Sequence, residues 1–358
     1  MRPPLRELVP YQVAVYPGVI KLDANENPYP FPAAIRDAIC AALDGEAFTR
    51  YPDGAAQALR EALARYAGLA PGNVLVGNGS DEIILNILLT FGTGRRVVIA
   101  APTFGMYRLH SLVAGAEPVE VPRGTDFAVE PSALLAAARA RGAAMIILCS
   151  PNNPTGNVTP LADIERLLQE FAGLVVVDEA YAEFSGTSAA GLVSRCPRLV
   201  LLRTFSKAFG LAGLRVGYML AGEDVVQAVW RVKQPFNVNT FSQLAALAVL
   251  NARDVFQERI EAICRARDEL YKGLEELPGV TAFPSRANFI LFRTPLPAAE
   301  VYHGLLRRGI LIRNVDGPLL PGCLRVTVGR PEENARFLEA LADVLRAGSP
   351  TGTPHPNV

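Results

Sequence analysis

Short apolar runs alternate with polar loops and amphipathic segments between about residues 74 and 220. Apart from a polar residue at one end of three of them, the runs are continuously apolar, which is typical of strands that are buried on both faces of a mostly parallel sheet. The runs are NVLV (73–76), VVIA (97–100), MIILC (145–149), LVVVD (174–178), LVLLR (199–203) and VGYML (216–220). The alternation therefore predicts an α/β fold with a mostly parallel central sheet and helices on both of its faces.

A different mixture of elements follows this region. A long helical pattern rich in Ala, Leu, Arg and Glu covers residues 241–276, and strand-like NFILF (288–292) comes next. A helical segment at 297–309 and strand-like LRVTVG (324–329) complete the pattern. These segments predict a smaller α+β domain, and 358 residues are enough for two cores.

The expected domain boundaries follow from this division. We predict a large, ligand-binding domain over residues 45–255. Residues 1–44 and 256–346 are expected to form the small domain, with a mobile N-terminal segment. Residues 347–358 are rich in Pro, Gly and Ser, which predicts a disordered tail.

Charge and composition exclude several classes of partner. Lys plus Arg and Asp plus Glu balance at 35 each, so the chain has no excess positive charge to hold nucleic acid or an anionic membrane. No apolar run is long enough to cross a membrane, and the amino terminus lacks the core of a signal peptide, which predicts a cytoplasmic protein. Scattered cysteines and only three histidines predict no metal site.

Polar residues and glycines follow five of the apolar runs. In an open parallel sheet, ligands bind beyond the carboxyl ends of the strands, so these loops are expected to meet at one crevice. The loops are GNGSDE (77–82), APTFGMY (101–107), SPNNPTG (150–156), DEAY (178–181) and TFSK (204–207).

Lys207 and Asp178 suggest the chemistry of this crevice. An ammonium group in apolar surroundings has a lowered pKa, and the neutral amine can form a Schiff base with an aldehyde. Asp178 ends a run of valines, and a buried carboxylate needs a cationic partner such as a protonated pyridine nitrogen. Together the two residues suit pyridoxal phosphate. Alternatively, Lys207 covers apolar surface with its ammonium group in water, and Asp178 caps the next helix.

The cofactor phosphate would need a cradle of donors. The backbone amides of Gly79, Ser80 and Asp81 open a helix and attract an anion there, although the same residues also describe an ordinary helix start. Ser206 adds a hydroxyl and Arg215 a guanidinium group.

The pyridine ring would need partners at its face and at its oxygen. Phe104 or Tyr107 could cover the face, although aromatic residues after a strand more often belong to the core. Asn153 and Tyr181 could donate hydrogen bonds to the ring oxygen, while NNPTG is also a good turn sequence.

With these residues in place, the chain resembles the fold-type I aminotransferases that use pyridoxal phosphate. The motifs that carry this resemblance are SPNNPTG, DEAY and SKAFGLAGLRVGY (206–218). Over about residues 9–345 the chain is most similar to the histidinol-phosphate aminotransferase subfamily. The segments in question are VPYQ (9–12), LDANENPYP (22–30), RYPDG (50–54), GNGSDEIILNIL (77–88), PTFGMY (102–107), RTFSKAFGLAGLRVGY (203–218), GILIRN (309–314) and GCLRVTVG (322–329).

The resemblance implies a role for each cofactor residue. Lys207 would carry the cofactor, Asp178 would pair with its ring nitrogen, and Tyr181 would join them as a catalytic residue by bonding the ring oxygen together with Asn153. Phe104 would stack on the ring, where relatives often have tyrosine. The phosphate would be held by Ser206, Arg215 and the amides from Gly79 to Asp81.

The resemblance also implies a homodimer and a set of substrate residues. Tyr51 would reach the phosphate of a neighbouring subunit. Arg325 would bind the anionic end of the substrate, assisted by Arg313, by Asn25 and by Tyr11 of the N-terminal segment. Alternatively, Arg325 lies in an alternating strand and faces water.

The implied reaction belongs to histidine biosynthesis: glutamate donates its amino group to imidazole acetol phosphate, giving histidinol phosphate and 2-oxoglutarate. One guanidinium fork can bind either a phosphate or a carboxylate. The segment VAVYPG (13–18) and the extra cation Arg330 depart from the expected pattern and leave the substrate open. The alternatives are an aromatic amino acid aminotransferase, a threonine-phosphate decarboxylase and a non-catalytic sensor that binds pyridoxal phosphate. A dinucleotide-dependent dehydrogenase is disfavoured because GNGSDE does not supply GxGxxG.

Overall fold

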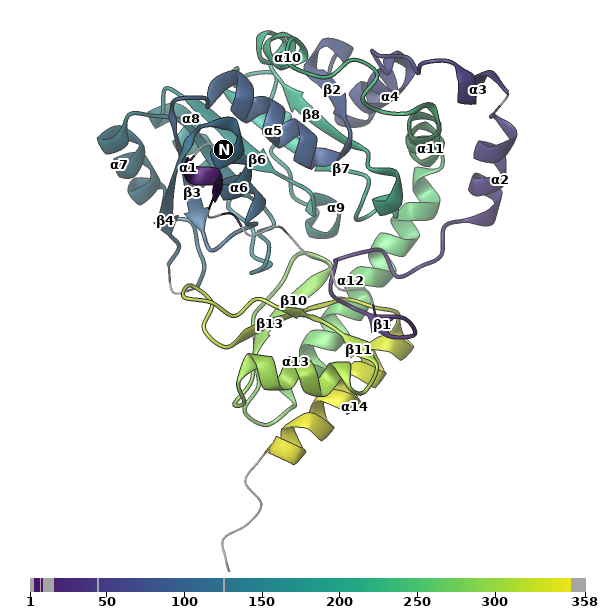
Figure 1. Cartoon of the computed structure of the whole chain (residues 1–358), viewed down its shortest axis with the longest axis vertical. Coiled ribbons are helices and arrows are strands. Elements are labelled where there is room, and N and C mark those ends of the chain that lie inside the picture. The colour runs from purple at the N-terminus through teal and green to yellow at the C-terminus, as the bar shows by residue number, and fades with distance from the viewer. Residues whose placement is uncertain (1–2, 7, 9–15, 44, 125, 349–358) are drawn as a thin grey trace, which may run out of the picture.

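The computed structural model describes residues 3–348 apart from residues 7, 9–15, 44 and 125. A larger part is built around a seven-stranded sheet, and a smaller part is built around a four-stranded sheet (Figure 1). The long helix α12 (Arg253–Glu275) runs between the two parts. The predicted α/β class with a second, smaller α+β unit is confirmed.

The seven-stranded sheet has the order β2-β8-β7-β6-β5-β3-β4. Strand β8 is antiparallel to both of its neighbours, and the remaining pairs are parallel. Its strands are β2 (Val74–Gly77), β3 (Arg96–Ala101), β4 (Glu117–Pro122), β5 (Ala143–Cys149), β6 (Leu174–Asp178), β7 (Leu199–Thr204) and β8 (Gly217–Ala221). All six predicted apolar runs are therefore strands.

Strand β4 was not predicted. Its sequence, EPVEVP, mixes glutamate and proline with valine, so it does not form an apolar run. It pairs only with β3 at the edge of the sheet, where proline and charged residues are tolerated.

Helices cover both faces of this sheet. Successive residues of a strand point to opposite faces, so each strand contributes to two cores. In β3, Val97 and Ile99 belong to one core cluster and Val98 and Ala100 to another. The first cluster includes α5 (Gly79–Phe91), α6 (Met106–Ala114) and α10 (Glu223–Trp230). The second includes α4 (Gln57–Ala67), α7 (Pro131–Arg141), α8 (Leu161–Glu170) and α11 (Thr240–Asn251).

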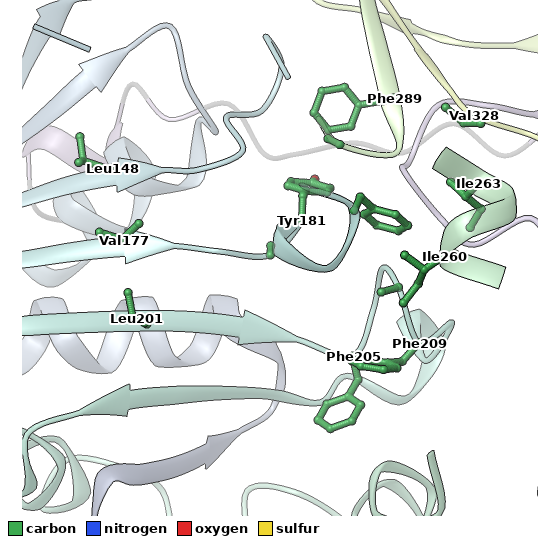
Figure 2. Packing of buried hydrophobic residues seen from close by; sticks show 14 of the residues in the cluster. Leu148, Val177, Tyr181, Leu201, Phe205, Phe209, Ile260, Ile263, Phe289 and Val328 are labelled. Atoms are coloured by element: carbon green, nitrogen blue, oxygen red, sulfur yellow. The ribbon is translucent and has the colours of Figure 1, made fainter. Parts of the chain in front are cut away.

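The second cluster continues into the smaller part of the molecule. Tyr181 of the large part meets Phe289 of the small sheet, with ring centroids 5.1 Å apart (Figure 2). Ile260 and Ile263 of α12 lie in the same cluster. The predicted boundary at residue 255 therefore crosses a continuous apolar core, and the division into domains stays a prediction.

The smaller part has an antiparallel sheet of order β12-β13-β10-β9 and a two-stranded parallel pair of β1 with β11. The strands are β1 (Ile20–Lys21), β9 (Thr281–Ala282), β10 (Phe289–Arg293), β11 (Ile310–Leu311), β12 (Arg313–Asn314) and β13 (Cys323–Thr327). Its helices include α13 (Ala298–Leu306) and α14 (Pro331–Gly348). Residues near both ends of the chain thus share one unit.

Two details differ from the predicted elements. The helical stretch at 241–276 is divided into α11 and α12 at Ala252, whose ψ of 29° is not helical. Helix α14 continues to Gly348, two residues past the expected boundary, and the rest of the predicted tail lies outside the described residues.

Short helices make up the remaining regular structure. These are α1 (Pro3–Arg6), α2 (Ala33–Ala41), α3 (Glu46–Thr49), α9 (Ala182–Ser185), η1 (Pro71–Asn73), η2 (Ala190–Leu192) and η3 (Ala212–Leu214). Within the part of the chain that the structure describes, no helix has the length and apolar character needed to span a membrane.

Candidate active site

A cavity of about 630 Å³ lies at the carboxyl ends of the central strands. The five predicted loops all contribute to its wall, together with residues 21–25 and with the small sheet. Lining residues include Asn25, Ser80, Asp81, Phe104, Asn153, Asp178, Tyr181, Ser206, Lys207, Arg215, Arg313 and Arg325. The structure therefore brings together most of the predicted site residues.

Lys207 follows β7 and reaches the cavity. Its Nζ donates a hydrogen bond to the carbonyl oxygen of Ala24 at 3.0 Å. Burial lowers the pKa of Lys207 to about 8, and the positive charge of Arg325 acts in the same direction. A usable fraction of this amine is therefore neutral near pH 7, and a neutral amine is a nucleophile.

Lys21 lines the same cavity but differs electrostatically. Its ammonium group contacts the carboxylates of Asp23 and Glu26. Burial tends to lower the pKa of Lys21, but Glu26 and Asp23 outweigh that effect and raise the pKa. Of the two lysines at the cavity, Lys207 is the one suited to attack an aldehyde.

Asp178 is buried at the end of β6. Its Oδ2 accepts a hydrogen bond from the hydroxyl of Tyr107 at 2.7 Å, and its Oδ1 accepts one from the amide of Ala180 at 3.0 Å. Burial raises the pKa of Asp178 to about 6, although both hydrogen bonds oppose this change. The N-cap of α9 is Tyr181, so the alternative that Asp178 caps this helix is wrong.

Tyr107 and Phe104 have different positions, which the sequence could not separate. Tyr107 is fully buried at the wall of the cavity and donates to Asp178. Phe104 lines the cavity and meets the edge of Tyr107, with ring centroids 5.6 Å apart. Phe104 is therefore placed to cover a ring, whereas Tyr107 holds the carboxylate. No local pattern in PTFGMY distinguishes these roles.

Arg215 lies against the amino terminus of α5. Its guanidinium group pairs with Asp81 at 3.0 Å and donates to the hydroxyl of Ser206 at 3.5 Å. A Cβ on Gly79, whose φ is +80°, would lie 2.6 Å from Nη2 of Arg215. Close approach of the guanidinium group therefore requires glycine here, and the helix end together with Arg215 and Ser206 forms a cradle that fits an anion.

Asn153 and Tyr181 both line the cavity and contact each other. The hydroxyl of Tyr181 accepts hydrogen bonds from Asn25 at 3.0 Å and from Asn153 at 3.4 Å. Burial raises the pKa of Tyr181, which keeps the hydroxyl protonated and able to donate.

Arg325 is buried in β13 and points into the cavity, so the expectation of a water-facing arginine is wrong. Its guanidinium group donates to Oδ1 of Asn153 and to the carbonyl oxygen of Asp23. Arg313 lies opposite Arg325 in the β12–β13 register and lines the same cavity. Two guanidinium groups therefore lie at one end of the site.

Asn25 joins the N-terminal segment to the small sheet. Its backbone N–H donates to the hydroxyl of Thr327 at 2.9 Å, and its backbone carbonyl oxygen accepts from the side chain of Asn288 at 3.0 Å. Its φ of +54° lies in the left-handed region, which asparagine tolerates better than most residues. These bonds direct the side chain toward Tyr181.

This geometry agrees with a known family. The family described as aminotransferase class I and II matches residues 17–341. The chain belongs to this family.

Relatives extend the match to nearly the whole chain. A histidinol-phosphate aminotransferase of Desulfitobacterium hafniense (strain DSM 10664 / DCB-2) is 41% identical over 353 residues, which cover 97% of each chain. That of Thermococcus gammatolerans is 43% identical over 348 residues, covering 97% of this chain and 98% of the relative. The solved histidinol-phosphate aminotransferase of Sinorhizobium meliloti, in complex with pyridoxal-5'-phosphate, has a TM-score of 0.88 at 27% identity and covers 97% of this chain and 98% of that one.

The cavity of this aminotransferase fits the predicted cofactor. Asp178 is a buried carboxylate whose hydrogen-bond donors are neutral, and a ring cation would relieve the strain on its charge. The amine of Lys207 and the anion cradle at Gly79 provide for the aldehyde and the phosphate. The predicted fold type and family are therefore confirmed.

Two residues singled out in the sequence, Tyr51 and Arg330, do not line the cavity. Tyr51 is 82% exposed and stacks on Phe236 with centroids 4.7 Å apart, away from the cavity of its own chain. Tyr11 lies outside the described residues. Arg330 pairs with Glu332 and Glu333 and is not among the residues that line the cavity.

Proposed function

We propose that this chain is a histidinol-phosphate aminotransferase that uses pyridoxal phosphate and glutamate. The observation that carries the proposal is one cavity with three features: an amine of lowered pKa, a buried carboxylate, and a pair of arginines. The relatives that match nearly the whole chain bear the same name.

The cofactor would be held at five places. Lys207 would bond its aldehyde, Asp178 would pair with the ring nitrogen, and Phe104 would cover one face of the ring. Asn153 and Tyr181 would donate to the ring oxygen. The phosphate would lie in the cradle made by Gly79, Ser80, Asp81, Ser206 and Arg215.

Pyridoxal phosphate supplies an electron sink for the carbanion that forms when the amine-bearing carbon loses its proton. Lys207 is the base in this proposal, since burial lowers the pKa of its amine to about 8. Asp178 contributes a fixed negative charge, and its own pKa would fall once a cation lies beside it. The hydrogen bonds from Tyr181 and Asn153 would favour negative charge on the ring oxygen.

Arg325 and Arg313 would bind the anionic end of the substrate. A guanidinium fork binds carboxylate and phosphate with similar geometry, so the same pair can accept glutamate and histidinol phosphate in turn. Asn25 lines the cavity and donates to the hydroxyl of Tyr181, and Tyr11 is expected to approach from the N-terminal segment.

We also propose a cytoplasmic homodimer. The exposed ring of Tyr51 does not serve its own cavity, which supports a contribution to the phosphate site of a neighbouring subunit.

Absorbance titration of the purified holoenzyme tests the proposal. Histidinol phosphate is expected to change the visible band of the bound cofactor at a lower concentration than phenylalanine does. Half-saturation at lower phenylalanine concentration would instead identify an aromatic amino acid aminotransferase. Release of carbon dioxide from threonine phosphate would identify a decarboxylase, and cofactor binding without any turnover would indicate a sensor.

A further inference from the structure

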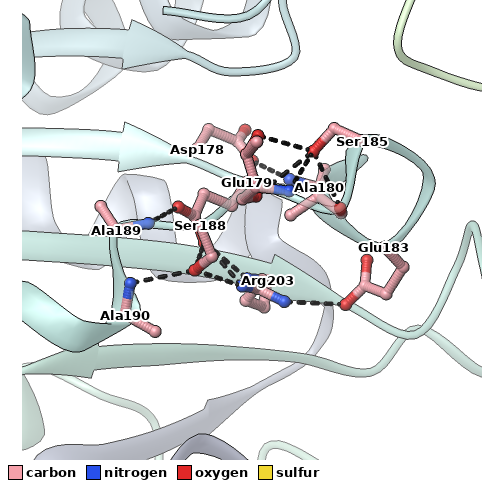
Figure 3. Close-up of polar contacts among 11 residues, drawn as sticks. Asp178, Glu179, Ala180, Glu183, Ser185, Ser188, Ala189, Ala190 and Arg203 are labelled. Carbon is pink, nitrogen blue, oxygen red and sulfur yellow. Dashed lines mark hydrogen bonds and ion pairs between the residues drawn. The ribbon is translucent and has the colours of Figure 1, made fainter. Parts of the chain in front are cut away.

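A buried cluster of charges lies behind the ends of β6 and β7, outside the residues that line the cavity (Figure 3). The guanidinium group of Arg203 contacts Glu179 at 2.8 Å, Glu183 at 2.9 Å and the hydroxyl of Ser188 at 2.7 Å. The side chains of Arg203, Glu179 and Glu183 are 9%, 3% and 6% exposed. One cation thus joins two carboxylates in the interior.

The cluster connects the two turns that carry the cofactor residues. Glu179 directly follows Asp178 in the turn after β6, and Glu183 lies two residues after Tyr181 in the short helix α9 that continues this turn. Arg203 belongs to β7, three residues before Ser206 and four before Lys207. The ion pairs therefore fix one turn against the other.

A neighbouring loop completes the arrangement. Glu179 also accepts hydrogen bonds from the amide of Ala189 and from the hydroxyl of Ser188 at 2.9 Å. The five donors of a guanidinium group form a planar fork, so contacts on several sides restrict both the distance and the orientation of its partners. An apolar contact of the same size would allow the turns to rotate or slide.

Burial of these charges is costly, which argues that the cluster does more than add stability. Well-packed apolar residues in place of a buried ion pair are often neutral or stabilising. Burial raises the pKa of Glu183 even though Arg203 opposes this change, so the carboxylate is not fully compensated. Burial alone would lower the pKa of Arg203, but Glu183 and the neighbouring Tyr218, Glu179 and Tyr66 together outweigh it and raise the pKa, so the arginine stays charged.

We infer that Arg203 is a positioning residue for the cofactor. It sets the separation between the turn with Asp178 and Tyr181 and the turn with Ser206 and Lys207, although it does not itself line the cavity. This inference rests on the proposed pyridoxal phosphate site. Loosening the cluster is expected to displace the groups at both ends of the cofactor and to weaken the hydrogen bond from Tyr181.

Replacement of Arg203 by lysine tests the inference, since lysine keeps the charge and loses the fork. Equilibrium dialysis of the Arg203→Lys holoenzyme is expected to show a Kd for pyridoxal phosphate about 10- to 100-fold higher than that of the unmodified protein. The pH midpoint of the visible band is expected to rise, because a weaker hydrogen bond to the ring oxygen increases the proton affinity of the Lys207 nitrogen.

Arg195→Lys is the matched control. Arg195 pairs with Glu165 at 2.8 Å on the surface, and its side chain is 65% exposed. The Kd of Arg195→Lys for pyridoxal phosphate and the pH midpoint of its visible band are expected to match those of the unmodified protein. The positioning role is wrong if Arg203→Lys changes only the unfolding midpoint. In that case the Kd for pyridoxal phosphate would stay within about twofold of that of the unmodified protein, and the pH midpoint of the visible band would not change.

A second variant guards against poor folding of Arg203→Lys. Glu183→Gln keeps the oxygen that Arg203 contacts and removes one negative charge. Its Kd is expected to rise less than that of Arg203→Lys, and an equal or larger rise would contradict the role given to Arg203. If the unmodified protein fails to bind pyridoxal phosphate, the proposed function itself is overturned, whereas normal binding by every variant overturns only this inference.

Discussion

The two walls of the cavity are assembled in different ways. The wall with Lys207, Asp178 and the anion cradle consists of loops that directly follow strands of one sheet. The wall with Arg325 and Asn25 joins segments about 300 residues apart, as in the hydrogen bond from the amide of Asn25 to Thr327. The position of the first wall can be inferred from the order of the strands along the chain. The second wall forms only when the small part packs against the N-terminal segment.

The two walls also differ in charge. The base of the first wall holds a carboxylate whose hydrogen-bond donors are neutral, and burial raises the pKa of Asp178 to about 6. The second wall carries the positive charge of Arg325, which helps to lower the pKa of Lys207 in the first wall. A molecule with a cationic ring nitrogen at one end and anionic groups at the other fits this polarity.

Loss of Lys207 is expected to have the largest effect. Lys207→Ala removes both the covalent attachment and the base, so turnover is expected to fall about 10⁴-fold and the visible band of the bound cofactor to disappear. Lys21→Ala is the control at the same cavity, and it is expected to retain the band. Full activity in Lys207→Ala would show that the first wall does not carry the chemistry.

Asp178→Asn is expected to lower turnover about 100- to 1000-fold, because the ring nitrogen loses its charged partner.

The same substitution should stabilise the apoprotein against unfolding at neutral pH. Below about pH 4 the carboxyl group is protonated in both folded and unfolded states, so the two proteins should be similarly stable. Above about pH 6 the folded wild type holds a buried charge, and the variant should be more stable by about 3 kcal/mol.

Chemical denaturation of the apoproteins from pH 4 to pH 8 measures this difference. The difference in the free energy of unfolding between the two apoproteins should grow between pH 4 and pH 6. If it does not grow, burial does not raise the pKa of Asp178.

Arg325→Lys separates the two walls. The variant keeps the charge but loses the fork that contacts Asn153 and Asp23, so kcat/KM is expected to fall about 10- to 100-fold for glutamate and for histidinol phosphate. Steady-state kinetics and cofactor dialysis should be measured together. If the Kd for pyridoxal phosphate rises as much as kcat/KM falls, the walls act as one unit rather than as two.

Tyr107→Phe is expected to have the smallest effect. It removes a hydrogen bond of 2.7 Å to Asp178 without changing the shape of the core. The Kd for pyridoxal phosphate is expected to rise about 10-fold, as for the loss of one hydrogen bond to a charged group. Phe104→Leu is the contrasting variant, since it removes ring contact without touching Asp178, and identical changes in both variants would contradict the separate roles.

Local sequence patterns predicted the first wall well. Continuous apolar runs gave the strands, and the strand-end rule then placed Asp178, Asn153 and Lys207 at one cavity. The edge strand β4 was not predicted, because its prolines and glutamates do not form an apolar run. The break at Ala252 was not predicted, because the helical composition continues across it.

Residues that act through tertiary contacts could not be predicted in this way. The hydroxyl of Tyr107 meets Asp178 across 71 residues, and Arg203 meets Glu179 across 24. Neither partner is recognisable from its neighbours in the sequence. The family resemblance suggested Arg325 and Asn25, but only the fold shows that both reach the same cavity.

Reductive trapping tests the central claim most directly. Borohydride treatment of the holoenzyme, followed by proteolysis and mass spectrometry, should place the cofactor on the peptide that contains Lys207. Lys21, Lys233 and Lys272 should stay unlabelled. Label on Lys21 at the same cavity, or no label on any lysine, would contradict the account.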